Sequence, residues 1–320
     1  MKILAIRQIL VSITTLLCVL LFVKSIDDLP LYFFIVAISL LINNLWLIKL
    51  AKLKIKLECD LQFIKLLLKQ SIPLLFATLF SSTIGTFGIV FLSYTTNNEL
   101  TGLFSSAFKF IQLTFILAYI LINSFSSQIS QADSIDSKKS VAQKYSTYIL
   151  IICSIVAAEC FVFADVAIFI TFGKQFLPAA DLLKIFVFNG LFYYLSCYAA
   201  PLLRFWKYEK KVFIAYLISA IILVVVTIIL TNLYGAIGTA IASVIGELSV
   251  AAILLFFLYR VLHKIFIFKL IPFLICAFII TFLSRFAIEL FTDNIYYMPI
   301  AILFSAAVYL FIFVKVVFKR

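Results

Sequence analysis

Two acidic side chains, Glu159 and Glu247, lie about halfway along long apolar stretches of the sequence. An ionisable group at the centre of a membrane-spanning helix costs about 2.5–3.5 kcal/mol on insertion scales, so it tends to face a hydrated cavity or a polar partner. A carboxyl group in such a place can bind a proton or a sodium ion, which is the functional hypothesis for both residues. The alternative is a structural carboxyl that hydrogen-bonds to neighbouring helices.

A second set of polar side chains, Lys109, Gln112 and Asn123, lies along a single apolar stretch. The spacings of three residues and of about three helical turns place them on one face of a helix. Lys109 lies about one and a half turns inside the outer end of that helix. Its ammonium group could bind a phosphate as a point charge. Equally, its long side chain could reach the outer membrane interface, which would give it no role in binding.

These residues are positioned by a chain that is far too apolar for a soluble domain. Hydrophobic residues make up 65% and charged residues 12%, against about a quarter charged in soluble proteins. Because about 20 apolar residues cross the hydrocarbon core, the sequence predicts an all-α, polytopic membrane helix bundle of about ten transmembrane helices. The predicted spans are 3–23, 31–49, 72–93, 104–127, 146–169, 181–203, 212–232, 236–259, 270–290 and 299–316.

The breaks between spans carry residues that start helices or make turns. They are Asp27–Pro30, Ser71–Pro73, Asn97–Glu99 and Asn232–Gly235. Asp, Ser and Asn cap helices, Pro is tolerated in a first turn, and Gly permits a tight turn. The basic and apolar run 60–69 predicts a helix that lies along the membrane interface.

The positive charges alternate from side to side. Of the 26 Lys and Arg residues, all except five fall in every second gap between spans. Positive residues are retained in the cytoplasm, so both termini are predicted to be cytoplasmic. The net charge of +12 would then face anionic membrane lipids, and nucleic acid is not expected as a partner. The exceptions are Lys24, Lys174 and Arg285 near outer helix ends, the shallow Lys184, and Lys109.

The sequence gives little support for disulfides, a metal or cofactor site, or an enzymatic activity. The six cysteines include no CxxC pair, and the single histidine, His263, lies in a short basic loop, so no disulfide framework, metal site or cofactor is predicted. A membrane enzyme of polysaccharide assembly would need a cluster of acidic, Arg or His residues at an interface. The predicted outer loops are short and carry no such cluster, so an enzyme is not expected.

Several segments, in order, resemble one family of transporters. They are SIPL at 71–74, LTGLFSSAFK at 100–109, FGKQF at 172–176 and YGAIGTAIA at 234–242. The second is similar to a Gly-Leu-Tyr-Ser-Ala-Ala-Tyr-Lys pattern. The resemblance is to the lipid-linked oligosaccharide flippases (Wzx-type O-antigen transporters) of the multidrug/oligosaccharidyl-lipid/polysaccharide exporter superfamily. It covers roughly residues 60–260.

The chain departs from that family in two ways. Members often carry Asp or Asn midway along the helix before the Gly-Leu-Tyr pattern, whereas residues 84–89 here contain no acid. Members also usually have twelve to fourteen helices, so the resemblance implies that about four N-terminal helices are missing, unless the protein is a genuinely short one. On this interpretation, residues 1–50 are the last two helices of a truncated N-terminal lobe. Residues 51–70 are a basic cytoplasmic loop, and 71–320 are the C-terminal lobe with additional helices.

The resemblance implies a transporter of the bacterial inner membrane that flips undecaprenyl-linked oligosaccharide by alternating access. Its partners would be that substrate, membrane lipids, a coupling H+ or Na+, and other polysaccharide-assembly proteins. Glu159, Glu247, Lys109, Gln112 and Asn123 would then line the substrate path or bind the coupling ion. The alternative from the same superfamily is a cation-coupled multidrug exporter.

Overall fold

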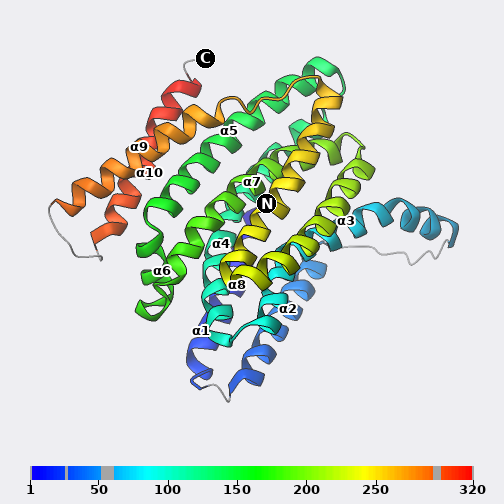
Figure 1. Cartoon of the computed structure of the whole chain (residues 1–320). Helices are drawn as coiled ribbons and strands as arrows, with labels where there is room; N and C mark the ends of the chain where they lie inside the picture. Colours follow the sequence, from blue (N-terminus) through cyan, green and yellow to red (C-terminus); the bar gives the residue numbers. More distant parts are fainter. Residues whose placement is uncertain (1, 26–27, 52–60, 291–296, 319–320) are drawn as a thin grey trace. The chain divides into compact units, whose positions relative to one another are not determined.

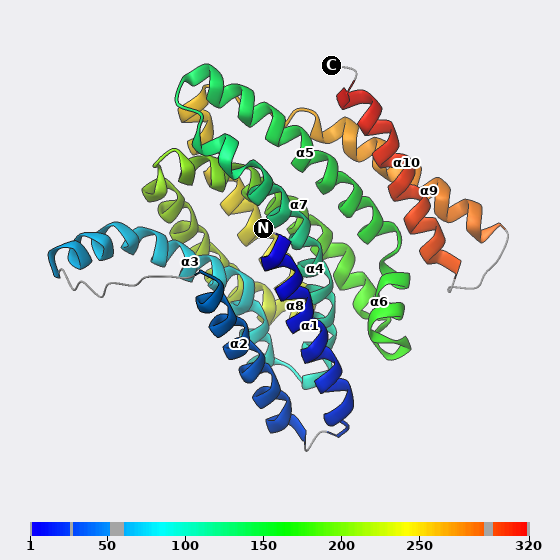
Figure 2. The ribbon, with the colours of Figure 1, turned by 180° about the vertical axis from the view of Figure 1, so that it is seen from behind.

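The structure is a computed structural model in which residues 2–25, 28–51, 61–290 and 297–318 are described, and every regular element in them is a helix (Figures 1 and 2). The helices are α1 (Lys2–Phe22), α2 (Leu29–Ala51), α3 (Leu61–Thr95), α4 (Asn98–Ser130), α5 (Ile135–Val162), α6 (Ala164–Phe172), the short 3-10 helix η2 (Lys174–Phe176), α7 (Ala179–Phe205), α8 (Glu209–Leu262), α9 (Leu270–Glu289) and α10 (Met298–Phe318). They form two compact units, Met1–Lys65 and Leu66–Arg320.

The first unit is a hairpin of α1 and α2. The Arg7 guanidinium on α1 is buried and donates a hydrogen bond of 2.8 Å to the backbone oxygen of Asn43 on α2. At the turn, the Asp28 carboxylate accepts from the backbone N–H groups of Lys24 and Ser25 at 3.0 and 2.9 Å. These bonds favour the ionised form, so the pKa of Asp28 lies below its usual range. Asp28 therefore closes the turn after α1, and α2 begins at the next residue, Leu29, within the predicted helix start at 27–30, of which residue 27 lies outside the described ranges.

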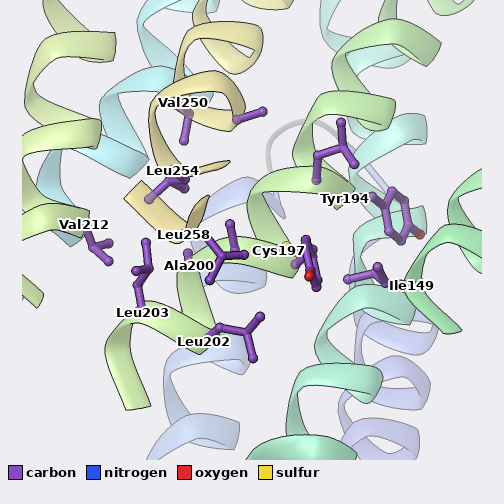
Figure 3. Packing of buried hydrophobic residues seen from close by; sticks show 14 of the residues in the cluster. Ile149, Tyr194, Cys197, Ala200, Leu202, Leu203, Val212, Val250, Leu254 and Leu258 are labelled. Carbon is purple, nitrogen blue, oxygen red and sulfur yellow. The ribbon is translucent and has the colours of Figure 1, made fainter. Parts of the chain in front are cut away.

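In the second unit the core is built around α7, whose buried residues contact α4, α5 and α8. Figure 3 shows apolar side chains of α7 facing those of α5 and α8. The buried Tyr145 and Tyr194 donate their hydroxyls to the backbone oxygens of Cys197 and Thr114, at 2.6 and 2.7 Å. Because lipid offers no hydrogen-bond partner, a buried aromatic residue with a polar tip needs such a neighbour. These bonds fix the positions of α4 and α5 along the axis of α7.

Helix α8 folds back on itself at Gly235, where the backbone has φ 57° and ψ −133°. The Oγ1 atoms of Thr231 and Thr239, on opposite sides of this turn, are 2.8 Å apart. Gly238 lies directly against the backbone oxygen of Leu230. The turn predicted at Asn232–Gly235 is therefore confirmed, and the small residues after it serve close helix packing.

Helices α9 and α10 pack together and against α5, as both overall views show. Aromatic contacts hold the pair: the ring centroids of Phe273 and Phe313 are 4.6 Å apart, and those of Tyr309 and Phe313 are 4.4 Å apart. Helix α5 therefore has one side on α7 and another on the α9–α10 pair.

The predicted membrane bundle is confirmed, since each of the ten predicted spans overlaps one or two of the helices. In the described residues, six helices are long and apolar enough to cross a membrane, or seven if two parts of α3 bent by 43° count as one. The long α8 counts once there, although it covers two predicted spans. Two details differ from the prediction. The span 146–169 is interrupted at Phe163, and the run 61–69 continues into the third span as α3, with residues 52–60 outside the described ranges.

Candidate functional site

Glu247 lies on the half of α8 that follows the turn, and it is buried against α7 with 7% of its surface exposed. The Ser196 hydroxyl on α7 lies 2.9 Å from Oε1 of Glu247 and 3.1 Å from the backbone oxygen of Phe192. A hydroxyl has a single hydrogen, which can go to either acceptor. The pair can thus accommodate Glu247 either as a carboxylate that accepts from Ser196 or as a neutral acid that donates to it.

Polar groups continue along the same buried side of α8. Thr239, Ser243 and Glu247 are spaced four residues apart and therefore follow one face of the helix. The Asn189 amide of α7 donates to the backbone oxygen of Ser243 at 3.0 Å. On the other arm of α8, the buried hydroxyl of Thr227 has no hydrogen-bond partner. The α7–α8 interface therefore contains a column of hydroxyl, amide and carboxyl groups inside a mostly apolar bundle.

Glu159 lies in a different place, on α5 where this helix meets α9 and α10. The Ser305 hydroxyl of α10 lies 2.5 Å from Oε1 of Glu159 and 2.8 Å from the backbone oxygen of Ala301. Thr281 of α9 lies beside the same carboxyl group. The second oxygen, Oε2, is buried without a hydrogen-bond partner. As at Glu247, a serine with a second acceptor on its own helix accompanies the acid.

Lys109, Gln112 and Asn123 are exposed on α4. None of their side chains makes a hydrogen bond or ion pair with the described part of the chain. Among the described residues, no such interaction links any two of the five predicted site residues. The sequence-predicted site residues are therefore found in three groups: the α7–α8 interface, the α5–α9–α10 junction and the open face of α4.

The sequence does not reveal the role of Arg285, for which it predicts only a position near an outer helix end. The Arg285 guanidinium on α9 donates two hydrogen bonds of 2.9 Å to the carboxylate of Asp165, at the start of α6. It also donates to the backbone oxygen of Val162 and, at 2.7 Å, to Glu289. Arg285 therefore bridges the break between α5 and α6. The local sequence around Phe163 has no Gly or Pro to signal this break.

The fold is similar to that of a solved membrane flippase. The chain matches the solved structure described as lipid II flippase MurJ, inward closed conformation, with a TM-score of 0.75 and 19% sequence identity. The match covers 97% of this chain and 66% of that one, so the protein spans about two thirds of the length of that flippase. No protein-family model matches the sequence, and no curated protein matches it either. The likeness thus concerns the fold.

Proposed function

We propose that the protein flips undecaprenyl-linked oligosaccharide units across the bacterial inner membrane for polysaccharide or O-antigen synthesis. The observation that carries this proposal is the fold, which matches that of a lipid II flippase over 97% of the chain. Alternating access would carry the polar head through the bilayer while the lipid tail stays in the hydrocarbon. The alternating positive charges support an orientation with both termini in the cytoplasm.

The exposed polar face of α4 supports a hydrated path. Lys109, Gln112 and Asn123 have no side-chain partner in the described chain, and unpaired polar groups are unfavourable against lipid tails. In the proposed mechanism this face lies along the path, and Lys109 contacts the pyrophosphate or an acidic sugar. Membrane lipids and other polysaccharide-assembly proteins are the expected further partners.

Ion coupling is assigned to Glu247 or Glu159. Each carboxyl is paired with a serine that has a second acceptor on its own helix, so the serine can turn when the acid gains or loses a proton. This arrangement supports H+ as the coupling ion. A Na+ ion would need additional oxygen ligands.

A reconstitution experiment tests the proposal. The full chain is placed in liposomes with undecaprenyl-pyrophosphate-linked oligosaccharide that carries a fluorescent label on the sugar, and a membrane-impermeant reductant is added outside. We expect more of the label to be reduced than in protein-free liposomes, while a labelled phosphatidylcholine stays protected. Equal protection of the oligosaccharide lipid with and without protein would contradict the proposal.

The second candidate is a cation-coupled multidrug exporter. The observation that favours it is the pair of deep carboxyl groups, because carboxylates in a membrane bundle attract cationic substrates. Efflux of a cationic dye from cells, driven by an imposed H+ or Na+ gradient, distinguishes the two. Dye efflux without oligosaccharide flipping would favour the exporter.

A further inference from the structure

The exposed face of α4 has two unlike edges. Gln112, Tyr119 and Asn123, which are spaced by seven and four residues, follow one edge. Leu113 and Ile120 follow the other, with 56% and 55% of their surfaces exposed. Tyr119 is as exposed as these two, at 56%. One edge therefore presents two amides and a phenol, with the exposed Ile116 among them, and the other presents Leu113 and Ile120 between the exposed Lys109 and Ser124.

Helix α7 adds a second aromatic side chain beside the polar edge. The ring of Tyr193 stacks on Phe115 of α4, with centroids 3.7 Å apart and planes inclined by 14°. Phe115 precedes Tyr119 by one turn, and the phenol groups of Tyr119 and Tyr193 lie next to each other. Because Tyr193 is held by the stack, the two phenols form a preorganised pair next to Gln112 and Asn123.

This combination of groups suits a sugar. A pyranose ring has a face of C–H groups that packs on an aromatic ring, and hydroxyls that both donate and accept hydrogen bonds. Gln and Asn amides likewise donate and accept, and Tyr combines an aromatic face with a polar tip. An aliphatic cargo would use none of these polar groups, and lipid tails would leave the amides unpaired.

We propose that Gln112, Tyr119 and Asn123 of α4, with Tyr193 of α7, form a sugar-binding surface for the oligosaccharide head. This inference rests on the proposed function, because it names the part of the cargo that the α4 face contacts. Its aromatic pair sets which sugars are accepted, while the pyrophosphate contacts Lys109 and the lipid tail stays in the hydrocarbon.

The liposome assay described above tests the surface with two lipids, the sugar-labelled undecaprenyl-pyrophosphate-linked oligosaccharide and undecaprenyl pyrophosphate without sugar, which carries the same label on its terminal phosphate. Tyr119→Leu is expected to raise the KM for the oligosaccharide lipid between about twofold and about tenfold, the size of an aromatic contact. Tyr119→Phe keeps the ring and is expected to retain most of the binding. The matched control is Ile120→Ala, on the other edge of the same helix and about three turns from Lys109, which should leave the KM unchanged.

The outcomes separate the two proposals. If the unmodified protein does not flip the oligosaccharide lipid, the proposed function fails. If it does so and Tyr119→Leu and Gln112→Leu leave the KM unchanged, the sugar-binding surface is wrong. A rise in KM that is equal for the sugar-free lipid would also overturn it, because the contact would then not involve the sugar.

A second measurement does not depend on transport. In a protein whose native cysteines are replaced, Gln112→Cys and Leu113→Cys are treated with a small membrane-impermeant thiol reagent. We expect the cysteine at 112 to react and the free oligosaccharide to slow that reaction, whereas the oligosaccharide should leave any reaction of the cysteine at 113 unchanged. If neither cysteine reacts with the reagent, the polar edge lies against lipid and the proposal is overturned.

Discussion

Ser196 on α7 donates a hydrogen bond of 2.9 Å to Oε1 of Glu247 on α8, inside an interface where both side chains are buried. The same hydroxyl lies 3.1 Å from the backbone oxygen of Phe192. Each protonation state of the acid therefore has a satisfied arrangement, with the hydroxyl hydrogen on one acceptor or the other.

Glu247→Gln tests whether the carboxyl group is needed for transport. The amide oxygen of Gln still accepts from Ser196, so we expect normal protein levels but reduced export of surface polysaccharide, because Gln cannot ionise. Ser196→Ala is the companion variant, and it should lower stability by about 1–3 kcal/mol by leaving a buried acid unpaired. Normal surface polysaccharide in cells with Glu247→Gln would rule out a role in coupling.

Glu159→Gln is expected to reduce export with little change in stability. The change exchanges Oε2, which has no partner, for an amide nitrogen in the same buried place. Protein level by immunoblot and surface polysaccharide by gel give the two readouts. If Glu159→Gln exports normally while Glu247→Gln does not, the α5–α9–α10 junction is structural and coupling belongs to the α7–α8 interface.

The sequence predicted helices and turns well wherever the signal is local. Asn97 caps α4 by accepting from the backbone N–H of Leu100, and Gly235 makes the turn in α8, both at predicted positions. The break at Phe163 could not be predicted, because it is held by Arg285, more than a hundred residues away. Likewise, the sequence placed Glu247 near the middle of a predicted span but could not show that Ser196 of the neighbouring helix α7 hydrogen-bonds to it.

Arg285 and Asp165 are expected to couple energetically. Two parallel hydrogen bonds of 2.9 Å and partial burial favour this pair over an exposed one. In a double-mutant cycle with Arg285→Ala and Asp165→Ala, thermal unfolding in detergent should show a coupling energy of about 0.5–3 kcal/mol. The control cycle uses Lys184 and Asp181, a more exposed pair for which about 0.5 kcal/mol or less is expected. Equal coupling energies in the two cycles would show that Arg285 does not stabilise the break between α5 and α6.

The charge pattern predicts which turns face the cytoplasm. A cysteine placed at Asn97, in the turn between α3 and α4, should react with an impermeant thiol reagent added to intact cells. A cysteine at Ser137, at the start of α5, should react only after the membrane is opened. Both are measured in the protein without native cysteines. If the cysteine at position 137 reacts in intact cells, the orientation is opposite to the predicted one and both termini lie outside.

Gly238 is expected to be indispensable to the α8 hairpin. A Cβ atom at this position would run into the backbone oxygen of Leu230, which cannot move aside as a flexible side chain can. Gly238→Ala should therefore destabilise the protein by about 1–3 kcal/mol or more, seen as a lower unfolding temperature and poor expression. Gly102, on α4, is the matched control, because a Cβ there meets nothing within 4 Å. Gly102→Ala should be neutral or stabilise by up to about 1 kcal/mol, since Ala favours the helix. If both variants unfold at the temperature of the unmodified protein, the two arms of α8 are not packed as closely as the contact between Thr231 and Thr239 requires.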